Sequence, residues 1–342
     1  MPGPMAAGGL LFPPRAAAPS VRVRFLLAGR ALDLTTDDAA LIAEAATVLG
    51  RPQPAEGASP ADLQAEVTLA GGFAQLHLRM TNPEHLSPAD LLLAAGSADF
   101  PFALLEAEGP RAVFSRRGES TPALLVNGGE CRLAQLEGWR KALSLLLLQR
   151  VMRSRDDALF FHAASLAVRG RGLLLVGAKG AGKSTLALAL AARGHALLGD
   201  ENACVLVESA TLLPFRRPLG VKPGPRAAAV ERALFARGLS PERDGMMRLA
   251  VESLFDAALP EPAPLAAIVF LAGFAPATRL LALDPGRTDV GRLQPVGASM
   301  VNAPPARRAF EMARLLAGSR VFELVAGPPD EAASALEEAV PA

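Results

Sequence analysis

The sequence predicts an α/β protein in two parts, a small α+β domain followed by a larger domain in which strands and helices alternate. Three observations predict this fold class. Short runs of alternating apolar residues fill much of 21–80, as in half-buried strands. A long apolar helical pattern covers 133–152, and a strand, a glycine-rich loop and a helix then follow one another over 173–193. The expected parts are a flexible tail at 1–20, an accessory α+β domain at 21–120 and an α/β domain at 121–342.

The elements of the first part follow from periodicity and turn residues. Residues 21–29 alternate as a strand does, and 37–50 have helical spacing. Proline and glycine make 51–60 a connector. Two alternating runs within 65–80 flank Gly71 and Gly72, which predicts a hairpin.

The second part opens with the helix expected at 133–152. A loop rich in proline, glycine and cations is expected at 214–227, and a buried strand at 264–277. The remaining elements are a helix at 305–318, a strand at 319–327 and a helix at 330–340.

The composition argues against nucleic acid and membrane partners. The chain has 35 basic and 34 acidic side chains, so its formal charge of +1 creates no overall field for a polyanion. It has no tyrosine and one tryptophan, and so lacks the aromatic side chains on which unpaired bases stack. The apolar stretch 264–277 is shorter than the roughly 20 residues that span a bilayer.

The cysteines and the first residues predict a cytoplasmic protein. Cys131 and Cys204 are far apart and lack C-x-x-C spacing, which argues against a disulfide framework and a zinc site. Residues 1–20 lack the basic region that opens a secretory signal. Both observations fit a reducing cytoplasm.

Residues 177–184 match the phosphate-loop pattern G-x-x-x-x-G-K-[ST], between an apolar strand and a helix. Glycines let backbone N–H groups point at a polyphosphate, and the helix N-terminus adds positive charge. Lys183 would reach the outer phosphates and Ser184 would bind Mg2+. A glycine turn that merely caps a helix needs no lysine at this position. The expected nucleotide-binding residues are Gly177, Ala178, Lys179, Gly180, Ala181, Gly182, Lys183, Ser184 and Thr185.

Lysine is rare in this chain, which has 31 arginines and 4 lysines. Lys183 and Lys179 therefore stand where a compact ammonium group is specifically needed. Lys179 can equally be a solvated loop residue.

Polar residues on both sides of the loop are expected to join it. If 160–168 and 172–178 pair through a turn at 169–172, His162 lies opposite residue 179; the alternative is a structural histidine. A short strand ending at Asp200 and Glu201 would deliver two acids to the same edge, suited to magnesium or to a general base. Their alternative is a solvated turn.

The stretch 162–203 resembles the catalytic core of HPr kinase/phosphorylase and of the wider group of HPr-kinase-like proteins, which are similar in structure to phosphoenolpyruvate carboxykinases. The order of features carries the resemblance: a histidine strand, a phosphate loop, "RGH" at the helix end and then an acidic pair. It is firm over 160–205 and extends over 130–335. The implied fold is a P-loop kinase core with a mixed sheet.

The resemblance also implies roles for individual residues. Lys183, His162 and Asp200 would be catalytic, with Asp200 as the base that deprotonates an acceptor serine. Ser184, Asp200 and Glu201 would hold the metal, although the family usually has aspartate where this chain has Glu201. Within "RRPLGVK", Arg217 and Lys222 resemble a basic substrate or nucleotide loop, and a solvated basic loop is the alternative for them.

The predicted function is therefore a kinase that uses ATP or GTP with Mg2+ to phosphorylate a hydroxyl of an unknown protein or peptide acceptor, with serine as the expected acceptor residue. Two features favour a kinase. The strand at 264–277 ends in no acid, unlike that of a conventional P-loop ATPase, and the glycine- and acid-rich loop of the bifunctional enzymes is missing. The alternatives are a non-catalytic nucleotide-binding regulatory module and a kinase for a small hydroxylated molecule. Family members form oligomers, so a homo-oligomer is a further expectation.

Overall fold

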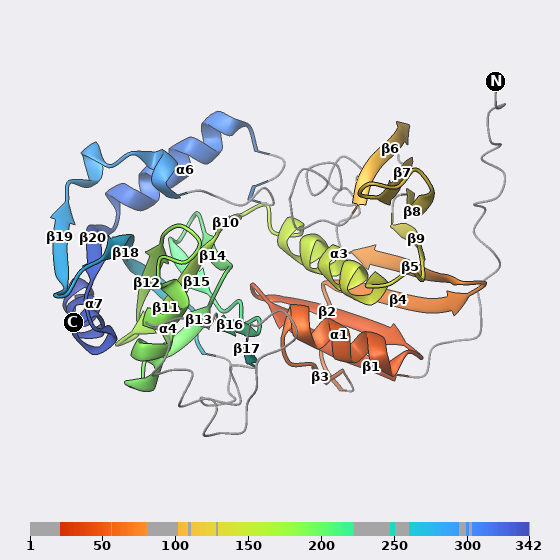
Figure 1. Cartoon of the computed structure of the whole chain (residues 1–342), viewed down its shortest axis with the longest axis horizontal. Helices are drawn as coiled ribbons and strands as arrows, with labels where there is room; N and C mark the ends of the chain where they lie inside the picture. The colour runs from red at the N-terminus through yellow and green to blue at the C-terminus, as the bar shows by residue number, and fades with distance from the viewer. Residues whose placement is uncertain are drawn as a thin grey trace. The chain divides into compact units, whose positions relative to one another are not determined.

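A computed structural model of the chain shows two compact units (Figure 1). The first unit extends to Val151 and the second begins at Met152, except that Leu26–Gly29 and Leu49–Arg51 group with the second. None of the helices in the described ranges is both long and apolar enough to cross a membrane. The structure describes residues 21–55, 57–80, 102–108, 111–127, 129–221, 247–249, 260–293, 299–300 and 303–341.

The first unit is built on a nine-stranded sheet with the order β3-β1-β2-β4-β5-β9-β8-β7-β6. Strands β2 and β4 are parallel, with helix α1 between them in the chain, and the hairpin around Gly71 and Gly72 is present as β4 and β5. The elements are β1 (Val21–Leu27), β2 (Arg30–Thr36), α1 (Ala39–Leu49), β3 (Gln53–Pro54), β4 (Leu63–Ala70), β5 (Phe73–Met80), β6 (Phe102–Glu108), β7 (Arg111–Arg116), β8 (Pro122–Asn127), β9 (Glu130–Ala134) and α3 (Trp139–Arg153).

The helix predicted at 133–152 begins later, at Trp139, because the residues before it form β9. Side chains alternate between buried and half-buried along β9, which pairs with β5 and β8. The domain boundary expected after residue 120 lies between β7 and β8. These two strands pair with each other in one sheet, so the boundary would divide that sheet. Helical periodicity alone did not separate the strand from the helix that follows it.

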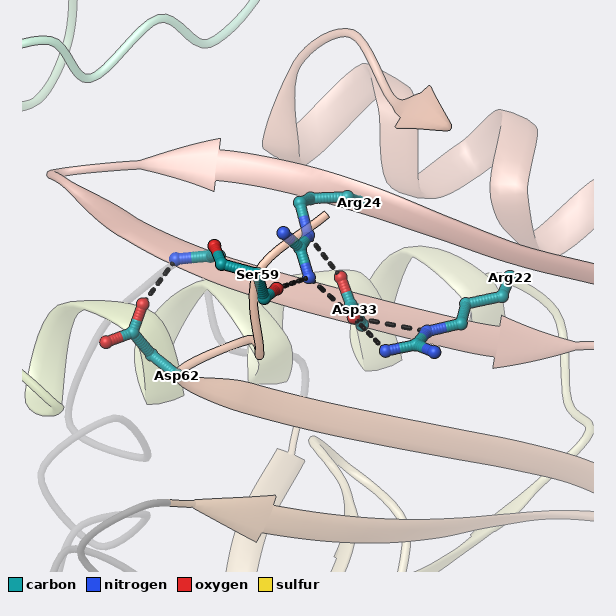
Figure 2. A network of polar contacts seen from close by, with 6 residues as sticks. Arg22, Arg24, Asp33, Ser59 and Asp62 are labelled. Carbon is teal, nitrogen blue, oxygen red and sulfur yellow. Dashed lines mark hydrogen bonds and ion pairs between the residues drawn. The ribbon is translucent and has the colours of Figure 1, made fainter. Parts of the chain in front are cut away.

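A partly buried ion network joins β1 and β2 in the first unit (Figure 2). Arg24 donates to Asp33 through Nε and Nη2, at 2.6 and 3.0 Å, and Arg22 donates through Nε at 3.1 Å. Arg24 also donates to the carbonyl oxygen of Ser59 at 2.7 Å. Both carboxylate oxygens of Asp33 are therefore occupied by guanidinium groups.

The second unit contains a mixed sheet at its centre. Strands β12, β18 and β20 are parallel to one another, while β11, β13 and β19 run antiparallel to their neighbours. Strands β10, β14 and β15 continue the sheet through β18. The strands are β10 (Ala158–Phe161), β11 (Ala163–Val168), β12 (Arg171–Val176), β13 (Ala196–Gly199), β14 (Ala203–Leu206), β15 (Thr211–Leu213), β16 (Leu219–Val221), β17 (Met247–Leu249), β18 (Ala263–Phe274), β19 (Arg279–Leu283) and β20 (Arg320–Ala326).

Helices cover both faces of this sheet, α4 and α7 on one face and α6 on the other (Figure 1). The sheet has a hydrophobic core on each face, and successive side chains of β12 point alternately into one core and the other. Leu173 and Leu175 pack with α4 and α7, while Leu174 and Val176 pack with α6. The helical elements are α4 (Lys183–Ala192), η4 (Pro285–Arg287), η5 (Val290–Leu293), α6 (Pro305–Ala317) and α7 (Pro329–Ala339). The expected strands and helices beyond residue 260 agree with β18, α6, β20 and α7.

Each unit holds one free cysteine, and both side chains are buried. Cys131 lies on β9 and Cys204 on β14. Burial raises the pKa of Cys131 to about 11 and that of Cys204 to about 12.

Candidate functional site

The loop between β12 and α4 owes its shape to glycine. Gly180 and Gly182 have φ angles of 86° and 97°, in the left-handed region that strains other residues. Gly182 is the N-cap of α4, and among the residues that the structure describes no side chain caps this helix end. A helix start without a side-chain cap can turn its first backbone N–H groups towards a bound anion.

Two glycines also let the loop lie close to the end of β18. A Cβ atom on Gly177 would lie 3.0 Å from Cβ of Leu271 and 3.1 Å from Cβ of Ala181. A Cβ atom on Gly182 would lie 3.2 Å from the ring of Phe274. Close packing therefore adds a second reason for glycine at these positions.

Lys183 lies at the start of α4 with its side chain folded back over the loop. The residue is 7% exposed, and its Nζ donates to the carbonyl oxygens of Gly177 at 2.6 Å and Ala178 at 3.2 Å. Lys179, the second lysine of the loop, is exposed. The two lysines thus differ: one is held against the loop backbone and the other faces solvent.

Asp200 forms a hydrogen bond with Ser184, the residue that follows Lys183 in α4. It directly follows β13, which runs antiparallel to β11, and β11 runs antiparallel to β12. The ends of β12 and β13 therefore meet at one edge of the sheet, and Ser184 Oγ donates to Asp200 Oδ2 at 2.6 Å. Asp200 is 3% exposed, and its other carboxylate oxygen, Oδ1, has no hydrogen-bond partner in the part of the chain that the structure describes.

The surroundings of Asp200 favour its protonated form more than water does. Burial is the main cause, and the charge of Glu201 acts in the same direction. The hydrogen bond from Ser184, a backbone hydrogen bond from Glu201 and the charge of Lys183 oppose them. The result is a pKa of about 6, against 3.8 for an ordinary aspartate.

His162 separates β10 from β11 and contacts the acidic pair. Its Nδ1 lies 3.1 Å from the carbonyl oxygen of Glu201. Because a carbonyl oxygen only accepts, Nδ1 is the nitrogen that carries the proton. The predicted position opposite residue 179 is wrong by two residues, because Ala163 pairs with Val176 and the turn contains only Arg169 and Gly170, with φ angles of 51° and 75°.

Glu201 has a left-handed backbone, with φ of 62°, and an exposed side chain. Glutamate rarely adopts this conformation. Its backbone carbonyl serves His162, while its carboxylate adds negative charge beside Asp200. Within the described ranges no group of three or more acidic, histidine or cysteine side chains could hold a metal on its own.

A segment that follows β15 brings Arg217 to the acids. Phe215 forms a parallel bridge with Gly199, its N–H donates to the carbonyl oxygen of Leu198 at 2.7 Å, and Arg216 Nε donates to the carbonyl oxygen of Leu197 at 2.9 Å. Burial lowers the pKa of Arg217, and the charges of Glu201 and Asp200 oppose that shift. Lys222, the other cation expected here, lies outside the described residues.

Sequence reasoning missed two residues that shape this part of the site. A Cβ atom on Gly199 would lie 2.7 Å from the carbonyl oxygen of Asn202 and 3.0 Å from that of Phe215, so only glycine fits between them. Arg216 is 7% exposed. The sequence signals for them were a glycine directly before the two acids and a pair of adjacent arginines. Neither signal predicts which residues Gly199 and Arg216 contact in the fold.

No protein-family model matches the chain, and no curated protein matches it either. One solved structure that it resembles is the Hpr(Ser) kinase/phosphatase from Coxiella burnetii. The sequences are 17% identical, the TM-score is 0.26, and the match covers 52% of this chain and 86% of the other. A likeness of this degree assigns neither a family nor an activity, so the function has to be judged from the residues of the site.

Proposed function

We propose that the second unit is a phosphotransferase that binds a nucleoside triphosphate with Mg2+ at residues 177–185 and passes its terminal phosphate to a hydroxyl, a serine of a protein or peptide. The observation that carries this proposal is the 2.6 Å hydrogen bond between Ser184 and Asp200. This bond places the hydroxyl of Ser184, which directly follows Lys183, beside the buried carboxyl group of Asp200. Phosphoryl transfer needs a metal ligand, cations and an aligned base in such proximity.

The loop and the start of α4 support phosphate binding. The uncapped N–H groups of α4 and the positive end of its dipole favour an anion there. The Lys183 ammonium can donate three hydrogen bonds, and two of them go to loop carbonyl oxygens, which hold the group beside the start of the helix. These groups would bind the outer phosphates.

The donor set fits magnesium. Ser184 Oγ and the Asp200 carboxylate are hard oxygen ligands, and Mg2+ needs only one or two protein ligands when phosphates supply others. The buried Asp200 Oδ1 atom, which has no hydrogen-bond partner among the described residues, is the kind of atom that a cation would satisfy. Ser184 and Asp200 would hold the ion, with Glu201 as the adjacent acid. When bound, the ion would neutralise charge on the phosphate oxygens.

The transfer itself would use Asp200 as the base. The acceptor oxygen forms a bond to the terminal phosphorus, the bond from that phosphorus to the bridging oxygen breaks, and the diphosphate leaves. Asp200 accepts the proton of the attacking hydroxyl. Without a bound ion, a pKa of about 6 leaves Asp200 ionised at neutral pH and more basic than an ordinary aspartate. His162, held through Glu201, would stabilise charge at the same place.

Nucleotide binding is the first test. Calorimetry with MgATP and MgGTP should show binding by the wild-type chain and a loss of about 100-fold or more for Lys183→Ala, because an ammonium on the outer phosphates is removed. Lys179→Ala, the matched lysine that faces solvent, should stay close to wild type. Equal affinity of the wild-type and Lys183→Ala proteins, both folded by circular dichroism, would refute the phosphate site.

Transfer is the second test. The wild-type chain is incubated with labelled ATP, Mg2+, a set of serine-containing peptides and a set of small alcohols. Labelled peptide is the expected product. Label on a small alcohol would instead indicate a small-molecule kinase, and tight binding with neither product would indicate a nucleotide-binding module.

A further inference from the structure

Residues 214–216 follow β15 and pack against the end of β13. Phe215 is bridged to Gly199, and a Cβ atom on Gly199 would lie only 3.0 Å from the carbonyl oxygen of Phe215. Backbone therefore lies directly on backbone here, with no side chain between the two segments to absorb a movement. Because Asp200 directly follows Gly199, a displacement of residues 214–216 would be passed on to the carboxyl group of the candidate site.

Gly50 approaches the same stretch closely. It belongs to Leu49–Arg51, a short segment from early in the chain that groups with the second unit. Its φ angle is 94°, and a Cβ atom on it would lie 2.5 Å from the carbonyl oxygen of Arg216. With any other residue at position 50, that carbonyl would have to move by about 1 Å to reach an ordinary van der Waals distance. Both the backbone conformation and the neighbouring carbonyl therefore require glycine here.

The turn between β1 and β2 makes a second contact with this stretch. Its residues Ala28 and Gly29, which also group with the second unit, have φ angles of 53° and 67°, as in two-residue hairpin turns. The Ala28 N–H donates to the carbonyl oxygen of Pro214 at 3.0 Å, and Arg155 Nη1 donates to the carbonyl oxygen of Ala28 at 3.3 Å. Arg155 is held in turn by Asp157, at 2.8 and 2.9 Å. The turn is thus anchored on both sides.

We propose that Gly50 and Ala28 position Asp200 for phosphoryl transfer, acting through residues 214–216 and the end of β13. This inference rests on the proposed function, in which Asp200 is the base and a metal ligand. Gly50 and Ala28 are positioning residues and touch no reacting atom. A displacement of about 1 Å at a reacting group can lower a rate by on the order of 100-fold. ATP should still bind, because the phosphate loop is built from β12 and α4.

The experiment compares Gly50→Ala with Gly170→Ala. Gly170 also has a positive φ angle, of 75°, but a Cβ atom on it would meet no atom of the described residues within 4 Å. Both variants carry the strain of a left-handed alanine, and only Gly50→Ala displaces the Arg216 carbonyl. In the labelled-ATP assay Gly50→Ala should lose about 10- to 100-fold in transfer rate, with its affinity for ATP within a few-fold of wild type. Gly170→Ala should transfer phosphate as the wild type does.

A double-mutant cycle distinguishes positioning from a general loss of structure. Adding Gly50→Ala to Asp200→Asn should cause little further loss of transfer, because the displaced group has already lost its charge. Hydrogen exchange of the backbone at 197–201 needs no activity. It should be faster in Gly50→Ala than in wild type and Gly170→Ala.

Arg155→Met tests the second contact and decides the matter if Gly50→Ala does not fold. It releases the Ala28 carbonyl, so it should show the same pattern with a smaller loss of transfer. Unchanged transfer in whichever of these variants folds, or losses that add to that of Asp200→Asn, would overturn the inference and leave the proposed function standing. A wild type that transfers no phosphate would remove the proposed function. Equal exchange at 197–201 in wild type and folded Gly50→Ala would remove the inference alone.

Discussion

Asp33 in the first unit and Asp200 in the second are almost equally buried, at 1% and 3% exposed, yet their surroundings act on them in opposite directions. Burial raises the pKa of Asp33, but hydrogen bonds from Arg24 and Arg22 outweigh it and leave the pKa below 3.8 (Figure 2). Asp200 receives hydrogen bonds from the Ser184 hydroxyl and the Glu201 backbone, which do not outweigh burial, and its pKa is raised to about 6. The partners of a buried carboxyl group, more than its burial, decide whether it is a structural ion or a group available for chemistry.

The largest effect should come from removing the charge of Asp200. Asp200→Asn keeps the size of the side chain and an oxygen that Ser184 can contact, so we expect the chain to retain ATP, with a higher Mg2+ requirement because the proposed metal ligand loses its charge. Transfer should fall by roughly 10²- to 10⁴-fold, the usual contribution of a general base. Calorimetry and the labelled-ATP assay measure the two quantities, and a variant with wild-type transfer would exclude Asp200 as the base.

The corresponding change in the first unit should affect stability instead. Asp33→Asn leaves the buried Arg24 without its counter-ion and should lower the free energy of unfolding by about 3 to 5 kcal/mol. Asp62→Asn is the matched control, because Asp62 is 32% exposed and its pairing with Arg30 is less costly to break. Urea unfolding followed by circular dichroism compares them, and equal losses would show that the Asp33 network has no special weight.

The opposite pKa shifts predict opposite dependences of stability on pH. The folded-state pKa of Asp200 exceeds the unfolded value of 3.8, so the ionised group destabilises the fold above pH 6, and this cost disappears as the pH falls towards 4. Asp200→Asn should therefore be more stable than wild type by about 3 kcal/mol at pH 8 and by almost nothing at pH 4. Asp33 stabilises the fold above pH 3.8 and loses this effect as the pH falls through its lower folded value. An Asp200→Asn protein less stable than wild type at pH 8 would contradict the raised pKa.

The smallest effect concerns the neighbour of Asp200. Glu201→Asn should increase the free energy of unfolding by about 1 kcal/mol, because asparagine tolerates the left-handed backbone better than glutamate. The contact with His162 uses the backbone carbonyl and should survive. Unfolding at pH 8 measures the gain, and a loss of stability would mean that the exposed carboxylate has a structural partner.

Local patterns predicted much of the fold, and the strand, loop and helix at 173–193 are the clearest case. Strand ends that share an edge also led us to expect Asp200 near the loop, and the structure brings Ser184 and Asp200 together. The errors came where a pattern does not specify its partner. The two-residue turn at Arg169 changed the register of His162, and β9 was hidden in an apolar run that continues into α3. The contact of Arg216 with Leu197 joins distant segments, which periodicity does not predict.

The placement of the two cysteines gives each unit its own built-in reporter. A thiol reagent in solution reaches Cys131 only when the first unit opens and Cys204 only when the second does. Labelling rates measured by mass spectrometry would thus report two separate opening free energies in the unmodified chain. A ligand that binds the second unit should slow modification of Cys204 and leave that of Cys131 unchanged.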